Sequence, residues 1–274
     1  MFDKIIENLD ERVPRADIEY FCEEDGLLHC SVCKAPVQTR IKHPFKDEWR
    51  IVHCVCKCKE LEQKARKEKE AQEERERRRR VCFNQTNMAL WNFQNDDRRN
   101  EKLSNAMERY VENFETFKKE GRGLLLHGKV GIGKTYYASC IANGLIDKGY
   151  HVLVTSFPEL VNKLQGTWDE KQEIIDSLNK YTLMVIDDLG VERGTEYMQE
   201  QIFNIVDSRY RSGLPFIVTT NLTMEQIKKP QDVAYQRIYD RILERCHPIE
   251  VNGVSRRKLK VADTYKNTQE LLGL

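Results

Sequence analysis

The sequence predicts an α/β protein: a three-layer domain with a parallel sheet between helices, preceded by a small cysteine-rich domain and a helical linker. Three observations lead to this prediction. After residue 83, short apolar segments alternate with amphipathic ones, as they do when strands and helices alternate along a parallel sheet. Most of the cysteines lie before residue 59, and the stretch that follows them is almost entirely charged. We therefore expect three parts, at residues 1–58, 59–82 and 83–274.

Composition limits the class of protein. The chain of 274 residues is long enough for one large or two modest domains, and 40% of it is hydrophobic. Its formal net charge is +1, so no overall field attracts nucleic acid, and any DNA site must be a local patch. A run of about 18 apolar residues is absent, and Met1–Glu7 lacks the apolar core of a signal peptide. We expect a cytoplasmic protein without a membrane partner.

The first part is expected to begin with a helix. Residues 1 to about 29 carry apolar side chains at helical spacing, with a break at Pro14 and a second apolar cluster around Tyr20. This helix is expected either to pack on the cysteine-rich domain or to bind a partner. Between the two cysteine motifs that follow, residues 36–41 look like a turn and a strand.

The clustered cysteines predict a zinc site. Without a secretion signal, such a cluster indicates metal binding in a reducing compartment rather than disulfides. Cys30-Ser-Val-Cys33 is a C-x2-C motif, and Cys54-Val-Cys-Lys-Cys58 offers three thiolates for the two places left on tetrahedral Zn²⁺. Free thiols are the alternative, but this segment has few large apolar residues to fold without a metal. The expected ligands are Cys30, Cys33, Cys56 and Cys58, with Cys54 as the substitute and His29 or His53 as weaker candidates.

The charged stretch from Lys59 to Arg80 predicts a solvated helical linker. Opposite charges recur four residues apart, and no apolar heptad is sustained. The run Arg77–Arg80 either contacts DNA phosphates or is simply solvated. The remaining cysteines lie in apolar surroundings and are expected to be small core residues: Cys82, Cys140 and Cys246.

Gly128-Lys-Val-Gly-Ile-Gly-Lys-Thr135 matches the phosphate-binding motif G-x-x-x-x-G-K-[ST] without a substitution. An apolar strand precedes it and a helix that ends at Gly149 follows it, so backbone N–H groups would face a polyphosphate at the positive end of a helix. Lys134 would reach the β- and γ-phosphates of ATP, and Thr135 would ligate Mg²⁺. The residues expected to line this site are Gly128, Val130, Gly131, Ile132, Gly133, Lys134, Thr135 and Tyr136.

Two further apolar strands end in polar residues. The strand from Thr182 ends in Asp187, expected to hold Mg²⁺, and Asp188, expected to polarise the attacking water, although glutamate is commoner at the second position. The strand from Pro215 ends in Asn221. Ligands of parallel sheets bind at the carboxyl ends of strands, so Asn221 is expected to orient that water. The alternatives are an acidic turn for the carboxylates and a helix cap for Asn221.

The other amphipathic segments predict helices. They cover residues 103–117, 157–180, 194–213 and 224–228, and a last strand is expected at 247–251 before a polar tail or short helix. Aromatic residues such as Trp91, just ahead of the phosphate loop, are expected in the core or against an adenine base. Arg237, Arg241 and Arg245 lie on one face of a further helix, an arrangement that suits phosphate.

With these motifs the chain resembles the AAA+ ATPases of the DnaC type, the bacterial replicative helicase loaders, over about residues 83–260 and in outline at the cysteine-rich domain. Thr219-Thr-Asn221 looks like sensor 1 of that family, and Arg237-Ile-Tyr-Asp-Arg241 is similar to its box VII. Gly253-Val-Ser-Arg-Arg257 resembles its sensor 2. The resemblance implies that Arg241 acts as an arginine finger on the nucleotide of a neighbouring subunit, that Arg257 contacts the phosphates of its own subunit, and that the active unit is a homo-oligomer.

The resemblance also implies partners. The cysteine-rich domain would bind a DnaB-like hexameric replicative helicase, and residues 157–180 would face single-stranded DNA, with Lys163, Lys171 and Lys180 as contacts or as solvated side chains. One rival is a transposition accessory ATPase of the IstB type, which acts with a transposase on duplex DNA. Another is a binding module that uses ATP only as a switch. We expect ATP, Mg²⁺ and Zn²⁺ as cofactors, with ATP hydrolysis that is weak until DNA or a partner binds.

Overall fold

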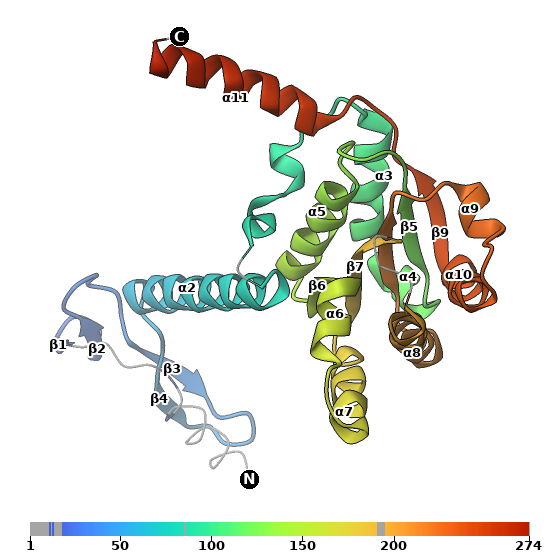
Figure 1. Cartoon of the computed structure of the whole chain (residues 1–274). Helices are drawn as coiled ribbons and strands as arrows, with labels where there is room; N and C mark the ends of the chain where they lie inside the picture. Colours follow the sequence, from blue (N-terminus) through green and yellow to red (C-terminus); the bar gives the residue numbers. More distant parts are fainter. Residues whose placement is uncertain (1–10, 12, 14–17, 85, 191–194, 274) are drawn as a thin grey trace. The chain divides into compact units, whose positions relative to one another are not determined.

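The computed structural model in Figure 1 describes residues 11, 13, 18–84, 86–190 and 195–273. The chain divides into two compact units, Met1–Glu74 and Arg75–Leu274. Within the described residues, no helix is long and apolar enough to cross a membrane.

The first unit contains two small antiparallel hairpins. Strand β1, Glu19–Cys22, pairs with β2, Leu27–Cys30, and β3, Gln38–Lys42, pairs with β4, Trp49–His53. The predicted helix is therefore wrong for residues 18–29, and its earlier part lies outside the described residues. The physical reason is the turn: Gly26 adopts a φ of +69°, and the Asp25 carboxylate accepts a hydrogen bond from the Leu27 N–H at 3.0 Å. An Asp-Gly pair between two short apolar runs favours a hairpin over a helix.

Helix α2, Lys57–Cys82, runs through the charged stretch as a single element of 26 residues, so the helical prediction is confirmed. Exposed ion pairs four residues apart, such as Arg66 with Glu70 at 3.6 Å, accompany it. At its carboxyl end, Arg78 donates to the Gly149 carbonyl, and Arg79 binds Asp147 and the Asn143 side chain. These arginines bind the negative end of the helix that follows the phosphate loop. One prediction was that they contact DNA phosphates, but Arg78 and Arg79 have partners within the protein.

The second unit is built on one parallel sheet of five strands in the order β6-β7-β8-β5-β9. Both of its faces are covered by helices (Figure 1). Leu124 and Leu126 belong to one apolar cluster, and Leu125 between them belongs to the other, because successive side chains of a strand point to opposite faces. The strands are β5 Gly123–His127, β6 Val152–Ser156, β7 Leu183–Leu189, β8 Phe216–Thr220 and β9 Cys246–Glu250.

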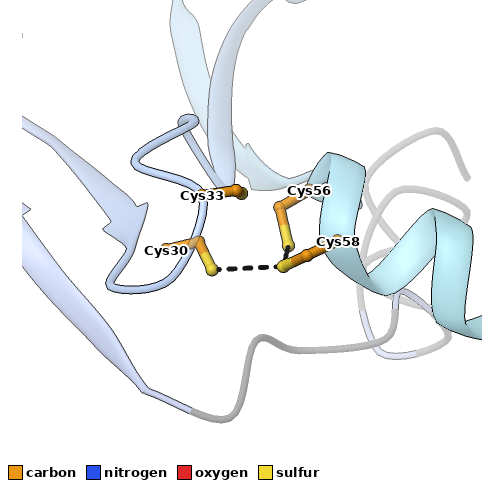
Figure 2. Close-up of side chains that lie close together, drawn as sticks. All are labelled: Cys30, Cys33, Cys56 and Cys58. Carbon is orange, nitrogen blue, oxygen red and sulfur yellow. Dashed lines mark hydrogen bonds between the residues drawn. The ribbon is translucent and has the colours of Figure 1, made fainter.

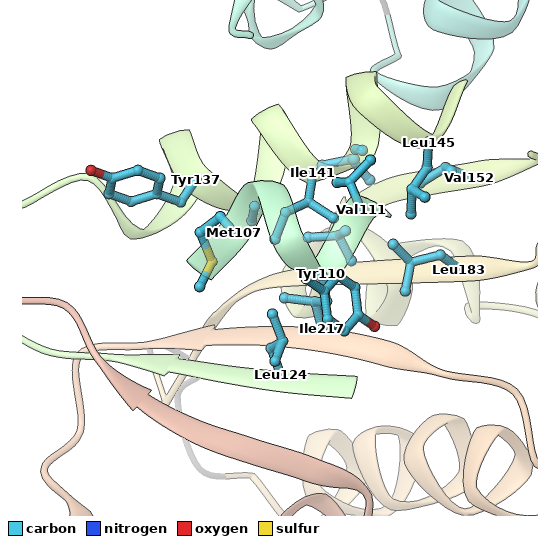
Figure 3. Packing of buried hydrophobic residues seen from close by; sticks show 14 of the residues in the cluster. Met107, Tyr110, Val111, Leu124, Tyr137, Ile141, Leu145, Val152, Leu183 and Ile217 are labelled. Atoms are coloured by element: carbon cyan, nitrogen blue, oxygen red, sulfur yellow. The ribbon is translucent and has the colours of Figure 1, made fainter. Parts of the chain in front are cut away.

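Helices α3, α4 and α5 cover one face of the sheet, and α6 to α10 cover the other. Figure 3 shows the first cluster, in which Tyr110 and Ile141 from two helices pack over Leu183 and Ile217 of the strands. Cys82, Cys140 and Cys246 are buried, as predicted. The helices are α3 Glu101–Glu112, α4 Phe114–Lys119, α5 Lys134–Asp147, α6 Phe157–Lys163, α7 Trp168–Leu178, α8 Glu196–Ser212, α9 Met224–Lys228, α10 Val233–Arg245 and α11 Arg256–Leu272, with short 3₁₀ turns η1 Asn87–Leu90 and η2 Phe93–Asn95.

Three helices differ from the prediction. The segment expected over 103–117 is interrupted at Asn113, and the segment expected over 157–180 divides into α6 and α7. The start of α7 is fixed locally, since Glu170 accepts a hydrogen bond from the Thr167 backbone N–H at 2.7 Å, in the manner of a capping box. At the carboxyl end, where a polar tail or short helix was expected, α11 is a helix of 17 residues.

Candidate functional site

The candidate site lies at the carboxyl edge of the sheet. Strands β7, β8 and β5 are neighbours in the sheet, so the residues that follow them meet at one edge. Asp187 and Asp188 come from β7, Asn221 follows β8, and the loop 128–133 joins β5 to α5. Segments that are distant in sequence therefore supply one site.

The glycines of the loop are required by its backbone. Gly128 and Gly131 adopt φ values of +143° and +81°, which favour glycine. A Cβ atom at Gly128 would lie 2.5 Å from the Val251 carbonyl oxygen, and one at Gly131 would lie 2.5 Å from the Ser255 Oγ. Gly133 precedes α5 without a side-chain cap, so the first N–H groups of that helix can bind an anion. The loop therefore fits a nucleotide phosphate.

Lys134 connects the phosphate loop with the end of β8. Its ammonium group donates to the Gly128 and Lys129 carbonyl oxygens at 2.9 and 2.8 Å and to the Asn221 Oδ1 at 2.7 Å. Only 5% of the residue is exposed. Burial lowers the pKa of Lys134, while the nearby carboxylates of Asp188 and Asp187 oppose that effect. The cation is thus held in the loop, within reach of a bound phosphate.

The Asp187 carboxylate accepts hydrogen bonds from two threonine hydroxyl groups. The Thr135 Oγ1 donates to its carboxylate at 3.0 and 3.1 Å, and the Thr219 Oγ1 donates at 2.5 Å. Burial raises the pKa of Asp187, and the hydrogen bonds from Thr219 and Thr135 act in the opposite direction. A hydroxyl and a carboxylate at this distance form the oxygen pair that holds Mg²⁺ in phosphate-loop proteins.

Asp188 has an uncommon backbone conformation. Its φ is +58°, in the left-handed region that non-glycine residues seldom adopt, and the pairing of β7 with β8 is irregular between Ile186 and Leu189. The Asp188 backbone N–H donates to the Thr219 Oγ1 at 3.0 Å. Asp187 is buried and does not line the cavity, whereas Asp188 does.

A cavity of about 380 Å³ lies over the loop. Arg256 enters it from the start of α11, with its guanidinium 5.1 Å from the Tyr136 ring centroid and 2.8 Å from Asp97. Trp91 also lines the cavity, and its ring centroid is 5.9 Å from that of Tyr136. The residues lining this cavity are Trp91, Val130, Gly131, Gly133, Lys134, Thr135, Tyr136, Asp188, Asn221, Arg256 and Arg257.

The cavity gathers most of the predicted nucleotide-site residues and adds Arg256, which the sequence reasoning missed. Its signal in the sequence is weak, since only its place beside Arg257 marks it. Asn221 does not cap a helix, because Thr223 is the N-cap residue of α9 and pairs with Gln226 in a capping box. The cap alternative for Asn221 is therefore wrong. Ile132 is buried beneath the loop and 6% exposed.

Arg241 is not among the residues that line this cavity. It lies on α10, where its Nε donates to the Asp207 Oδ1 of α8 at 2.7 Å. Its guanidinium carbon lies 4.6 Å from the Phe203 ring centroid. The geometry leaves Arg241 outside the cavity that the phosphate loop of the same chain forms.

A second candidate site lies in the first unit (Figure 2), where the sulfur atoms of Cys30, Cys33, Cys56 and Cys58 lie within 4.8 Å of one another. The Cys30 and Cys58 sulfurs are 3.5 Å apart, and those of Cys56 and Cys58 are 3.2 Å apart. Backbone N–H groups, that of Ala35 first, lower the pKa of Cys33 to about 6. Four thiolates from two turns fit the tetrahedral coordination of a structural Zn²⁺.

The alternative ligands lie outside this cluster. The Cys54 thiol donates to the Pro36 carbonyl oxygen at 3.5 Å, and burial raises its pKa. The His29 ring is hydrogen-bonded to Asp25 at 2.8 Å and to the Lys34 carbonyl oxygen at 2.9 Å. Cys22, Asp25 and His29 form a separate small group on the first hairpin that the sequence did not reveal.

The sequence of this chain is similar to those of two curated helicase loaders. The replicative helicase loader DnaI of Bacillus subtilis (strain 168) is 27% identical over 150 residues, covering 50% of this chain and 48% of the relative. The replicative helicase loader DnaC of Escherichia coli (strain K12) is 28% identical over 142 residues, covering 50% of this chain and 57% of the relative. The chain thus spans about half the length of the curated relatives it matches.

Solved structures resemble part of this chain. A crystal structure of DnaI is 30% identical, with a TM-score of 0.51, and the match covers 60% of this chain and 89% of that one. A crystal structure of the DnaC helicase loader is 24% identical, with a TM-score of 0.53 over 60% of this chain and 98% of that one, which bears on the fold alone. With the parallel sheet, these similarities confirm the predicted AAA+ fold.

One protein-family model covers the part of the chain that contains the phosphate loop, the two acidic residues and the parallel sheet. The model of the IstB-like ATP binding protein family aligns with residues 60–263. Because that span is well over half of the chain, this protein belongs to the family of IstB-like ATP binding proteins.

Proposed function

We propose that this protein is an ATP-dependent helicase loader in DNA replication. The observation that carries the proposal is the set of contacts that joins Lys134 to Asn221 and Thr135 to Asp187 at one edge of the sheet. These contacts suit a hydrolysable nucleotide, and two relatives that match about half of the chain are named replicative helicase loaders. The proposal extends their activity to this chain.

In the proposed site, loop N–H groups and Lys134 bind the phosphates of ATP. Thr135 and Asp187 would hold Mg²⁺, which supplies positive charge to the phosphate oxygens. Asp188 polarises the attacking water and Asn221 orients it, while Arg257 contacts the phosphates from α11. These residues bind the nucleotide and prepare it for hydrolysis, and a further cation from outside the cavity would stabilise the charge that develops at the γ-phosphate.

Arg241 of a neighbouring subunit would supply that cation. An arginine finger increases the rate of hydrolysis by about 10³–10⁵ in the GTPases where it has been measured. Since Arg241 lies outside the cavity of its own subunit, the isolated chain should hydrolyse ATP slowly, and assembly on DNA or on a partner should accelerate it. The functional form is a homo-oligomer with shared nucleotide sites.

The first unit would recognise the helicase. We assign residues 1–58 to a zinc-bound head, 59–82 to the linker and 83–274 to the ATPase. Cys30, Cys33, Cys56 and Cys58 would hold Zn²⁺ and fix the two hairpins. Large apolar side chains of the second hairpin, Phe45, Trp49 and Ile51, are 85%, 65% and 52% exposed. Exposed apolar groups of this kind favour contact with a protein partner, here a hexameric replicative helicase.

Single-stranded DNA would bind along α6 and α7. Lys163 ends α6 and Lys180 follows α7, and both are exposed. The Lys171 ammonium lies 5.1 Å from the Tyr197 ring centroid, so it has an aromatic neighbour on which a base could stack. Cations beside an aromatic ring are the usual elements of a site for single strands.

The first experiment separates a loader from its rival, a transposition accessory ATPase, which the name of the matched family also suggests. The full chain is mixed with the replicative helicase of the same cell, and complexes are isolated by size-exclusion chromatography. We expect co-elution that is lost when residues 1–58 are deleted, while the truncated chain still binds ATP. Binding to a transposase and not to the helicase would reverse the assignment.

The second experiment tests the nucleotide site. Lys134→Ala should reduce ATP affinity, measured by titration calorimetry. The loop contains two lysines, Lys129 and Lys134, and of these Lys134 lines the cavity. Arg241→Ala should leave ATP affinity unchanged and reduce hydrolysis by the assembled protein. Unchanged affinity in the first variant, or an unchanged rate in the second, would refute the proposed site.

A further inference from the structure

We propose that Asp207 on α8 is a positioning residue for the arginine finger, holding Arg241 in the orientation in which it meets the nucleotide of the neighbouring subunit. The inference rests on the proposed action of Arg241 in trans and adds to it the residue that prepares the finger before the subunits assemble.

The contact between the two side chains is short and shielded. The Arg241 Nε lies 2.7 Å from the Asp207 Oδ1. The Asp207 side chain is only 12% exposed, while that of Arg241 is 29% exposed. A charge-assisted hydrogen bond with one partner largely buried restricts the arginine more than a pair in solvent does. The carboxylate therefore acts as a fixed anchor in the face of α8.

The anchor leaves the outer end of the guanidinium accessible. Asp207 binds at Nε, and Nη1 makes only a long hydrogen bond, 3.3 Å, to the Arg237 carbonyl oxygen. The plane of the group is further restricted by Phe203, whose ring centroid lies 4.6 Å from the guanidinium carbon. A guanidinium held at Nε and supported by a ring presents its η nitrogens in a fixed direction. That arrangement suits recognition of phosphate oxygens.

The neighbouring arginines on α10 are held differently. Arg245 stacks 4.8 Å from the Tyr210 ring centroid and donates to the Tyr210 carbonyl oxygen at 3.4 Å. Arg237, one turn before Arg241, is exposed. Among the residues that the structure describes, Arg241 is the one of these three arginines with a carboxylate partner. The structure therefore singles out the arginine that the sequence motif marks as the finger.

Preorganisation explains why such an anchor matters. A free arginine side chain samples many rotamers, and ordering it at the moment of catalysis costs entropy. If Asp207 already orders Arg241 in the free subunit, the entropy cost of ordering the side chain does not add to the activation free energy of hydrolysis. Misplacement of a catalytic group by about 1 Å can reduce a rate about 100-fold. Loss of the anchor should therefore reduce hydrolysis in the neighbouring site, not in the subunit that carries the substitution.

Subunit mixing tests this directly. Donor subunits carry Lys134→Ala, so they provide a finger but bind ATP too weakly to fill their own site at the ATP concentration used. Acceptor subunits carry Arg241→Ala, so they bind ATP but provide no finger. ATP hydrolysis is measured at a protein concentration high enough for full assembly, where the rate per subunit of the unmodified protein no longer changes with protein concentration. We expect the mixture to recover hydrolysis, and donors that also carry Asp207→Ala to support a rate roughly ten- to a hundredfold lower.

Three controls separate positioning from a structural defect. Acceptors with both Arg241→Ala and Asp207→Ala should behave like acceptors with Arg241→Ala alone, in rate and in KM for ATP. Arg211→Ala in the donor removes the other partner of Asp207, an arginine whose side chain is 74% exposed, and should leave recovery unchanged. Asp207→Asn retains an oxygen that accepts from Nε, so it should give an intermediate rate, and it replaces Asp207→Ala if that variant unfolds.

The outcomes distinguish the two proposals. Full recovery with Asp207→Ala donors would overturn the positioning role and leave the shared site intact. Equal damage from Asp207→Ala in donors and in acceptors would show a structural role and would also overturn it. If Lys134→Ala donors recover no hydrolysis at all, the shared site itself is wrong and the positioning role is refuted with it.

Discussion

Thr219 links the two acidic residues that end β7. Its hydroxyl donates to the Asp187 carboxylate at 2.5 Å and accepts from the Asp188 backbone N–H at 3.0 Å. The side chain is fully buried. One hydroxyl on the neighbouring strand thus stabilises the ionised form of Asp187 and fixes the backbone that turns Asp188 toward the cavity. At the residue scale, Thr219 therefore couples the position of the proposed Mg²⁺ ligand, Asp187, to that of Asp188, the residue proposed to polarise water.

We predict that Thr219→Val moves the acid limb of the pH–rate profile to higher pH. Burial already raises the pKa of Asp187, and the Thr219 hydrogen bond opposes that rise. Removing the bond raises the pKa further, and activity that needs the carboxylate is lost as the pH falls through it. Thr220→Val is the matched control, because the Thr220 hydroxyl bonds the Leu189 carbonyl oxygen instead. An equal shift in both variants would contradict the prediction.

Trp91 gives a second prediction at this scale, since it lines the nucleotide cavity beside Tyr136. If the adenine base stacks on its ring, Trp91→Ala should weaken ATP binding by about 1–3 kcal/mol in calorimetric titrations. Trp49→Phe, in the first unit, should have no effect on affinity. Unchanged affinity of the Trp91 variant would place the base elsewhere in the cavity.

Arg209 connects several elements behind the site. It lies on α8 and is 1% exposed, without a carboxylate partner among the described residues. Its Nη1 donates to the Tyr181 carbonyl oxygen at 2.9 Å, and its Nη2 donates to the carbonyl oxygens of Thr182 and Pro215 at 3.1 and 2.8 Å. These carbonyls precede β7 and β8. At the element scale, one guanidinium fixes the starts of the two strands whose far ends carry Asp187 and Asn221.

We predict that Arg209→Met destabilises the ATPase unit by about 3 kcal/mol or more in urea denaturation, because several buried carbonyl oxygens lose their donor. Arg211→Met, on the same helix, should change stability by less than about 0.5 kcal/mol, since its side chain is 74% exposed. Similar losses in the two variants would mean that the buried guanidinium contributes no more than a surface charge.

The whole molecule consists of two units with different sources of stability. The second unit buries two large apolar clusters, one on each face of its sheet. Among the described residues of the first unit, the apolar cluster consists of Cys30, Val37 and Cys56 with a few partly buried neighbours. So small an apolar core does not offset the conformational entropy of folding without an additional constraint. A bound metal is the constraint that four neighbouring thiols can supply.

We predict that reduced protein carries one zinc per chain and that a strong chelator unfolds the first unit alone. Hydrogen exchange should increase over the hairpins at residues 18–53, while ATP affinity remains unchanged. Cys33→Ser should lose the metal, whereas Cys54→Ser should retain it, because the Cys54 thiol bonds the Pro36 carbonyl oxygen. Metal analysis that finds no zinc in the unmodified protein would contradict the prediction.

Much of the architecture was predictable because it is encoded locally. The loop from Gly128 to Thr135 needs glycine at its positive φ positions, and its strand and helix neighbours are recognisable by periodicity. The strands are apolar throughout because both faces of the sheet are buried, which also distinguishes them in the sequence. The first hairpin was missed because helical spacing of apolar residues outweighed the Asp-Gly turn at Gly26.

The sequence by itself determined the phosphate loop, the acidic strand end, the cysteine motifs and the alternation of strands and helices, since each depends on residues that are close together in the chain. Only the tertiary structure decided that Arg256 joins Arg257 in the cavity, that Cys56 and Cys58 rather than Cys54 meet Cys30, and that Asp207 holds Arg241. Such pairings depend on strand order and helix packing, and neither is written in the local spacing of residue types.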